Sequence, residues 1–562
     1  MSGLAGPLLN GFLAMRNFLF VTSLFGVGLV AGCTSAADQI PDPPVLTITS
    51  PARSLIQNGT AKVTVTGTVA PNAAGTPVTK VSVNNIVANV AADGSFSIDI
   101  DVKPGAMLLH TEALDADGGK AQDTRSLEAG ELRKPGQNIE SAVTTALSKE
   151  AFQKISAAAG PLIKGLDLKP MLAPMQPMVH SGDESGPDCL YGQLFVDDVK
   201  MQNVIIHLAP VAGGLQFSAE IDGLDVPGHM KYAVACLGGT DNTDIKATKV
   251  VVSGTLQVTP DGMNGFATNL ASPNVQLTGL DITSGGVPGA ILSIIPLDSA
   301  IEYIMPKVAG LVMKPMMNQA LGALAGPKTV NVLGKTLTVQ VSPANIEFSA
   351  NSALVTLDMQ MLLGGAEHSN GYIFTDNGQP NMDPGTGMQL GIADDLANEM
   401  LSQFVAIGML NLSLPESGGS FDGATMAATS PPMISANPAD GKMRLVLPDM
   451  IATFTSSGTP IAKAAINATV DLQIQPANNG LGVAIQLGKP NIYVDVLPDI
   501  ANESHYSNDE LSNAVQIGLD NQIASITALL GGIPLPAMAG LQMKDLSVTG
   551  SDGYVMVKGA LQ

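Results

Sequence analysis

The feature that most constrains the fold is a two-residue alternation of apolar side chains, which recurs in segments along most of the chain. It is clearest in 466–474, where every second residue is apolar, and it continues in 481–487 and 492–496. Successive side chains of a β-strand point to opposite faces of a sheet, so this period predicts long antiparallel strands with one apolar face each. At 562 residues, the chain is long enough for several domains.

The overall charge argues against one large class of partner. The chain has 27 Lys and Arg against 49 Asp and Glu, a formal net charge of −22. Such an excess of acid repels phosphate polymers, so no nucleic-acid partner is expected. The 26 methionines either fill an irregular core or line a surface that accepts ligands of variable shape.

The first 33 residues have the organisation of a secretory signal. Arg16 precedes an apolar run that ends in Val30-Ala31-Gly32-Cys33. This tetrapeptide looks like a lipobox, the site at which bacterial lipoproteins are acylated on cysteine and cleaved just before it. The alternative is a signal anchor with a chance cysteine. Residues 34–44 are polar and contain proline, as expected of a tether.

These features predict a protein of the bacterial outer membrane, anchored through lipid on Cys33, with its side of the membrane left open. Thr34 after Cys33 resembles the outer-membrane sorting pattern. Cys189 and Cys236 are then the remaining cysteines. In an oxidising compartment, such a pair is more often a disulfide than a reactive site.

Residues 45–128 have the pattern of a compact β-sandwich. Short alternating segments such as 63–69 and 96–102 are separated by the turn signals Asn84-Asn85 and Asp93-Gly94. The stretch resembles bacterial immunoglobulin-like modules, which are usually spacers. Asp115-Ala116-Asp117-Gly118 lacks the later carboxylates of a calcium loop, so a polar turn is expected there. Residues 129–136 are predicted to be a linker.

The rest of the chain shows an imperfect twofold repeat, which we divide into 137–363 and 364–562. In the first half, Ser148 is expected to cap a helix, strands follow in 215–221 and 250–258, and an apolar helical stretch occupies 289–325. The second half has a helix with Leu396, Met400, Phe404 and Ile407 on one face, the long alternating strands, and a helix capped by Asn508. The predicted class is α+β, with a curved antiparallel sheet around a helix in each half.

Two segments of the second half carry a family resemblance. Residues 532–557, with Gly532-Ile533-Pro534-Leu535-Pro536 and Asp552-Gly553-Tyr554, resemble the ending of the bactericidal/permeability-increasing protein family, and so do residues 390–412. The resemblance implies two tandem tubular barrels, joined end to end through a central sheet, with lipid held between a long helix and a concave sheet. It also implies one disulfide in the first barrel, which Cys189 and Cys236 could supply. Bactericidal members use a cationic tip to engage lipopolysaccharide, and this acidic chain departs from that pattern.

The resemblance therefore implies a protein that binds and transfers phospholipid-like lipids in an apolar tubular cavity, and the lipobox places this protein in the envelope. The alternative is a surface adhesion or scaffold protein, because the same alternation also builds a filled β core. Residues expected to line the cavity are chosen from helix and strand faces. They are Phe152, Ile155, Leu162, Phe217, Val252 and Leu256 in the first half and Met400, Phe404, Val470, Leu472, Val483 and Ile485 in the second.

No motif indicates an enzyme. Gly334-Lys335-Thr336 lacks the earlier glycine of a phosphate loop and is expected to be a turn. The six histidines are scattered without ligand spacing, and no cofactor or metal is expected. The acidic pairs Asp197-Asp198 and Asp394-Asp395 are expected to be solvated, in a loop and at a helix start.

Overall fold

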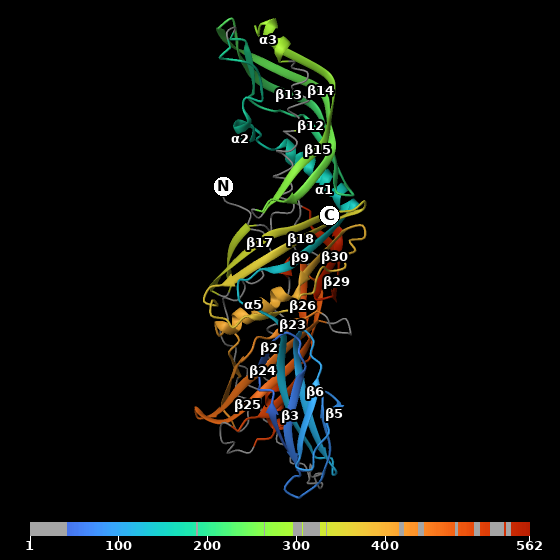
Figure 1. The fold of residues 1–562 in the computed structure, drawn as a ribbon, viewed down its shortest axis with the longest axis vertical. Helices are drawn as coiled ribbons and strands as arrows, with labels where there is room; N and C mark the ends of the chain where they lie inside the picture. Colours follow the sequence, from blue (N-terminus) through green and yellow to red (C-terminus); the bar gives the residue numbers. More distant parts are fainter. Residues whose placement is uncertain are drawn as a thin grey trace, which may run out of the picture.

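β-structure dominates the computed structural model, which is elongated (Figure 1). The structure describes residues 42–186, 189–262, 265–295, 306, 326–332, 334–414, 421–436, 443–477, 482–498, 506–517, 533–534 and 541–562. Cys33, the tether to residue 41 and most of the apolar stretch 289–325 lie outside the described residues.

The immunoglobulin-like module consists of two packed sheets. One sheet has the order β1-β3-β6, and the other contains β8-β7-β4-β5, with β2 parallel to β8. The core between them consists of inward-facing residues of both sheets, among them Val65, Val83 and Leu109. The strands are β1 (Val45–Ser50), β2 (Leu55–Asn58), β3 (Val63–Ala70), β4 (Val78–Val83), β5 (Ile86–Val87), β6 (Ser95–Ile100), β7 (Gly105–Asp115) and β8 (Lys120–Arg133). The alternating pattern thus predicted this sandwich correctly.

The last strand of the module extends beyond its expected end. β8 continues through 129–133, which had been expected to be a linker. Residues 129 and 130 pair with β2, and residues 131–133 pair with β19 (Tyr372–Phe374) of the second half. Gly130 has a φ of +144° at the start of this extension, a conformation that favours glycine. The module is therefore joined to the rest of the chain by strand pairing, with a short connection before residue 139.

The first half contains the longest strands of the chain. Its sheet has the order β10-β11-β13-β14-β15, and β12 pairs with β13. Helix α1 (Lys149–Lys164) begins where expected, since the backbone N–H of Ala151 donates to Ser148 Oγ at 3.1 Å. The other elements are α2 (Lys169–Leu172), a 3-10 turn (Ala173–Met175), β10 (Val179–Gly182), β11 (Tyr191–Val196), β12 (Asn203–Val211), β13 (Gly214–Val234), β14 (Leu237–Pro260), β15 (Phe266–Ser284) and α3 (Gly289–Ile294).

A seven-stranded central sheet is shared by the two halves. Its order is β16-β17-β18-β9-β20-β30-β29. β9 (Ile139–Ser148) pairs with β18 of the first half on one edge and β20 of the second half on the other. The remaining strands are β16 (Gly326–Val332), β17 (Lys335–Phe348), β18 (Ser352–Leu363), β20 (Met388–Ala393), β29 (Met543–Ser551) and β30 (Tyr554–Leu561).

The second half has its own antiparallel sheet of the order β21-β22-β24-β25-β26-β28, with β23 on β24 and β27 on β25. Its strands are β21 (Leu412–Leu414), β22 (Gly423–Ala427), β23 (Met433–Ser435), β24 (Met443–Ser456), β25 (Thr459–Ala477), β26 (Gly482–Leu487), β27 (Asn491–Val496) and β28 (Ile533–Pro534). Helix α5 (Asp394–Ala406) follows β20 directly.

A further helix starts at residue 508, but its cap differs from the expectation. The Ser507 hydroxyl accepts from the N–H of Glu510, whose carboxylate accepts from the N–H of Ser507. This reciprocal pair is a capping box, so the cap is Ser507. The Asn508 amide oxygen instead accepts from the N–H of Val496 at the end of β27.

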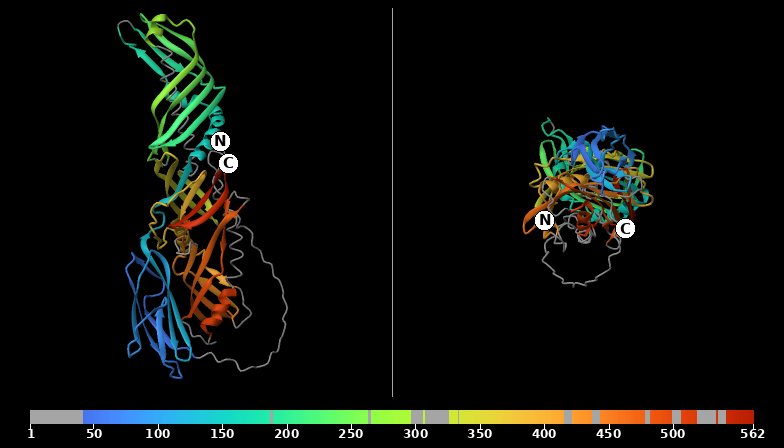
Figure 2. Two further views of the ribbon diagram at one scale, coloured as in Figure 1. Left: turned by 90° about the vertical axis from the view of Figure 1, so that its right-hand side faces the viewer. Right: turned by 90° about the horizontal axis from the view of Figure 1, so that it is seen from below.

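The immunoglobulin-like module lies beside the second half (Figure 2). Its strands β7 and β8 contact β24, and β8 also contacts β25 and β27. Consequently, β25 is buried on both faces between Ala464 and Ala468. The module is thus docked along its length and is not a free spacer in this structure.

Gly160 provides a test of how closely α1 approaches β12. A Cβ at this position would lie 2.3 Å from the Val204 carbonyl oxygen. Gly160→Ala must move α1 away from β12, although alanine favours a helix by about 1 kcal/mol. We expect it to lower the free energy of unfolding by about 1–3 kcal/mol.

The matched control is Gly289→Ala at the start of α3, where a Cβ would meet nothing within 4 Å. Chemical denaturation of both variants measures the difference. Equal stabilities for the two variants would contradict the close approach of α1 to the strand.

Candidate functional site

The inner face of the first sheet forms one large apolar cluster with α1. Phe152 and Ile155 of α1 lie in the same cluster as Phe217 of β13 and Val252 and Leu256 of β14. All five side chains are buried. The structure thus brings together five of the six residues selected in this half. The side chain of Leu162 lies outside the described residues.

Strand register explains why these residues share a face. In the β13–β14 pair, Leu215 lies opposite Leu256 and Ala219 opposite Val252, while Phe217 lies opposite Gly254. The Phe217 ring therefore lies beside Gly254, which has no side chain. Leu215 and Val250 belong to the same row and are fully buried. They were not selected, although the alternation that marked the strands contains them.

The apolar row of the outermost strand is less completely covered. On β15, five apolar residues lie opposite buried residues of β14: Leu270, Val275, Leu277, Leu280 and Ile282. These side chains are half-buried and pack against the same cluster. This row therefore offers apolar surface continuous with the buried interior.

A pocket of about 440 Å³ opens between α1, β12 and β13. Its lining includes Ala157 of α1, Ile206 and Leu208 of β12, and the polar Gln153 and Gln216. Ser156 lies in its wall and accepts from the N–H of Leu208 at 2.9 Å, which satisfies a donor on the free edge of β12. The volume falls in the range typical of small-ligand pockets.

The residues selected in the second half do not form one group. Leu472 and Ile485 belong to one cluster on β25 and β26, whereas Val483 joins the large cluster of the first half. Val470 is buried on the same strand face as Leu472 and Ile466.

The helix residues selected for this half lie elsewhere. Met400 and Phe404 pack beside the central sheet, against residues such as Met361 and Leu363. Among the described residues, Leu511 and Val515 of the helix that starts at residue 508 pack on β24, β25 and β27. Both were visible in the sequence as the apolar face of a helix, but no local signal assigns them to that sheet.

Helix α5 buries its polar face. Asn398 bonds to the backbone N–H and carbonyl of Ile434, and Gln403 bonds to the backbone of Met361 and Leu363. The polar residues at 394, 395, 398, 399, 402 and 403 form a stripe that the sequence displays beside the apolar one. The sequence alone does not say which stripe is covered by neighbouring strands.

Asp394 and Asp395 were expected to be solvated, and that expectation is wrong. Both are buried in the first turn of α5. Asp394 accepts from the N–H of Ala436 at 2.9 Å, and Asp395 accepts from the N–H of Thr375 at 3.0 Å. Burial raises the pKa of Asp394 to about 7 and that of Asp395 to about 6. These carboxyl groups connect α5 to the segments around it.

Glu399 is fully buried one turn further along α5. Its Oε1 accepts from the N–H of Gly136 at 2.7 Å and from Gln403 Nε2 at 3.2 Å. Its Oε2 has no hydrogen-bond partner within the part of the chain that the structure describes. Burial raises the pKa of Glu399 to about 8, against the lowering effect of these two hydrogen bonds.

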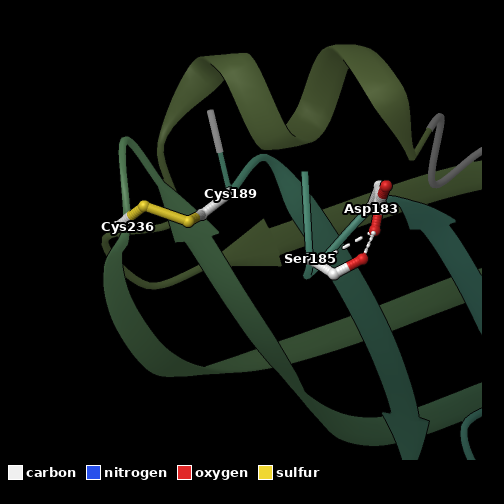
Figure 3. The surroundings of a disulfide bond; sticks show 4 residues. All are labelled: Asp183, Ser185, Cys189 and Cys236. Atoms are coloured by element: carbon white, nitrogen blue, oxygen red, sulfur yellow. Dashed lines mark hydrogen bonds between the residues drawn. A yellow bond between two sulfur atoms is a disulfide. The ribbon is translucent and has the colours of Figure 1, made fainter. Parts of the chain in front are cut away.

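Cys189 and Cys236 form a disulfide, as expected. It joins the segment before β11 to the tip of the β13–β14 hairpin, close to Asp183 and Ser185 (Figure 3). The hairpin turn places Ala235 and Cys236 at φ of +48° and +62°, the geometry of a type I′ turn without glycine. The bond therefore ties an unusual turn to the neighbouring loop.

Gly334, at φ +82°, lies in the turn between β16 and β17, as predicted. Across the described ranges, no group of three or more His, Cys, Asp or Glu side chains is placed to hold a metal ion. Within the same ranges, no helix is long and apolar enough to cross a membrane.

A family model matches the module, and solved structures align with 75–76% of the chain at low similarity. A family model for domain B of glucodextranase matches residues 44–130. A crystal structure of lipopolysaccharide binding protein aligns at 16% identity over 76% of this chain and 99% of that chain, with a TM-score of 0.33. P47 from Clostridium botulinum A2 aligns at 9% identity over 75% and 97%, with a TM-score of 0.23.

P47 of Clostridium botulinum E1 aligns at 9% identity over 76% of this chain and 100% of that chain, with a TM-score of 0.26. TM-scores of this size do not establish a shared fold. A comparison with curated proteins finds no match.

The buried carboxyl of Glu399 predicts a specific pH dependence of stability. Its pKa is higher in the folded chain than the ordinary 4.5, so the folded state holds this proton more tightly. The resulting stabilisation is present below about pH 4.5 and is lost as the pH rises through about 8. Glu399→Gln stays neutral, and its amide oxygen can accept both existing hydrogen bonds.

We therefore expect Glu399→Gln to be more stable than the wild type at pH 8, by about 1–4 kcal/mol, with the difference shrinking towards pH 5. Thermal unfolding across this pH range measures it. Glu347→Gln, at an exposed position on β17, is the control and should follow the wild type. A difference between Glu399→Gln and wild type that does not vary with pH would contradict the burial of a neutral acid.

Proposed function

We propose that the protein binds phospholipid-like lipids in the apolar interior of its two halves and transfers them. The observation that carries this proposal is the apolar inner face that runs from β13 through β14 to the half-buried row on β15. A lipid chain of about 16 carbons exposes apolar surface worth on the order of 13 kcal/mol in water. A carrier must therefore offer a long covered apolar face, and these strands supply one.

The tandem tubular arrangement is part of the proposal. The two half-barrel sheets meet at the central sheet, and the large apolar cluster extends from Ile291 of α3 to Val483 of β26. Acyl chains would lie along this interior with their headgroups outside. The net charge of −22 disfavours anionic headgroup recognition by bulk charge, so lipopolysaccharide neutralisation is not proposed.

We further propose that the chain acts without catalysis and is anchored to the bacterial outer membrane through Cys33. The support is the sequence pattern at residues 16–44. A cysteine carrying two or more acyl chains is held stably in a membrane. The docked immunoglobulin-like module would then serve as a stiff support between the anchor and the lipid-binding halves.

The competing function is that of a scaffold or adhesion protein. A variant at Ala247 distinguishes this function from lipid binding. Ala247 is buried on the inner face of β14. Ala247→Phe places a ring in the space that we assign to acyl chains. We expect wild-type protein lacking residues 1–33 to release near-stoichiometric phospholipid on solvent extraction, and the variant to release several-fold less.

Mass spectrometry of the extracts measures the ratio of lipid to protein. Gln257→Phe, at an exposed position on the same strand, is the control and should retain lipid. A scaffold with a filled interior would contain no lipid in the wild type. In that case, Ala247→Phe would only overpack the core and cost about 1–3 kcal/mol of stability.

The anchor is tested separately at Cys33. We expect the N-terminal peptide of the mature chain to begin at Cys33 and to carry acyl chains, and Cys33→Ser to lose both the acylation and the membrane association. Mass spectrometry of the N-terminal peptide and membrane fractionation measure these outcomes. A mature chain that begins elsewhere and carries no acyl group would overturn the anchor while leaving lipid binding untouched.

A further inference from the structure

The docked face of the immunoglobulin-like module is centred on one arginine. Arg53, in the loop between β1 and β2, donates to Asp123 at 3.0 Å, to Asp449 at 3.1 Å and to Asp495 at 3.2 Å. Asp123 belongs to β8 of the module, whereas Asp449 and Asp495 belong to β24 and β27 of the second half. We name these four residues the Arg53 cluster. It bridges two parts of the chain that are about 400 residues apart in sequence.

Both carboxylate oxygens of Asp449 accept hydrogen bonds. Besides Arg53, its oxygens accept from the N–H of Ser54, from the N–H and hydroxyl of Ser126, and from Asn467 Nδ2, at distances between 2.7 and 2.9 Å. Three of these four donor groups belong to Ser54 and Ser126 of the module. The carboxylate is therefore the main polar contact across the docked face.

Acidic groups nonetheless outnumber basic ones at this face. Arg125 on β8 pairs with Asp123 at 2.9 Å and is the second cation. Glu128, also on β8, is a fourth carboxyl group and is buried. Among these six residues, four carboxyl groups face two guanidinium groups, so the set has an excess of two acids when all are ionised. Uncompensated charge at a buried interface is strongly unfavourable.

Two carboxyl oxygens could each take up a proton, which would remove this excess negative charge. Asp495 Oδ1 and Glu128 Oε1 are buried and have no hydrogen-bond partner among the residues that the structure describes. The other oxygen of Asp495 accepts from the N–H of Thr124 at 2.9 Å and from Arg53. Each orphan oxygen can carry a proton without breaking an existing contact. The docked face would then be neutral.

We propose that the docked face is a proton-dependent latch. It holds the immunoglobulin-like module against β24, β25 and β27 while Asp495 and Glu128 are protonated, and it releases the module when both protons are lost. The module thereby changes from a fixed support to a pivoting arm. This inference does not depend on whether the chain binds lipid.

The direction of the pH dependence follows from burial. Burial raises the pKa of Asp495 to about 7, with Arg53 acting against this rise, and raises the pKa of Glu128 to about 8. Released, both groups would return towards ordinary values near 4. The docked state therefore binds more protons. This stabilisation of docking is fully present below about pH 4 and is lost as the pH rises through about 7 to 8.

His110 is a further titratable group at this face, and its protonation has the opposite effect on docking. His110 on β7 contacts the ring of Tyr493 on β27 at 5.0 Å, and Glu112 and Lys120 lie beside it. Burial lowers the pKa of His110, so its protonation opposes docking only on the acid side. Release at alkaline pH thus depends on Asp495 and Glu128.

Gly130 is the expected pivot. It lies between the docked part of β8 and residues 131–133, which pair with β19 of the second half. A Cβ there would lie 2.6 Å from Ile373 Cγ2. Glycine permits the backbone rotation that release requires while the β19 pairing remains intact.

Spin labels on the full chain in non-ionic detergent test the latch. Ile86→Cys places one label on an exposed strand of the module, and Thr459→Cys places the other at the exposed start of β25. We expect one narrow distance distribution at pH 6 and a second, broader population at pH 9. Each group contributes up to about tenfold per pH unit to the ratio of docked to released molecules.

Asp495→Asn combined with Glu128→Gln mimics the protonated pair and should keep the narrow distribution to pH 9. Asp101→Asn, at an exposed position of the same module, is the control and should behave as the wild type. Circular dichroism at each pH confirms that the chain remains folded. A wild-type distribution that is unchanged up to pH 9, or an identical change in the Asn/Gln variant, would overturn the latch.

Discussion

The structure depends on the pairing of β9 with strands of both halves. β9 lies between β18 and β20, and β20 in turn pairs with β30 at the other end of the chain. Backbone hydrogen bonds along a shared sheet are directional and leave little freedom for sliding or rotation. The two outer sheets are consequently held at fixed positions on either side of this sheet. The large apolar cluster can extend from one half into the other because the sheet between them is continuous.

The long strands of the first half create a large apolar face that other elements must cover. β13 and β14 have 21 and 24 residues, and each presents an apolar row that must be covered. Helix α1 packs into the same apolar cluster. It approaches β12 so closely that position 160 has no room for a side chain. Beyond the reach of α1, the row on β15 is only half-buried. Because these strands extend beyond the helix, part of their apolar face remains available for a ligand.

Buried carboxyl groups link the parts of the molecule. Those of α5 join the helix to Thr375, Ala436 and Gly136, which follow β19, β23 and β8. Those around Arg53 join the module to the second half. Burial raises the pKa of several of these acids towards neutrality. A chain with an acidic excess thereby gains contacts whose strength depends on pH, at positions where neighbouring elements meet.

The sequence by itself determined the features that depend on near neighbours. Alternation placed the strands, the Ser148 cap placed the start of α1, and two cysteines outside the signal segment predicted the disulfide. Tertiary structure alone decided which strands pair over hundreds of residues, and therefore that 129–133 extend β8 instead of forming a linker. It also decided that α5 buries its polar stripe and that Met400 lies apart from Val470, because a helix carries two stripes and the surrounding strands select the one that is covered.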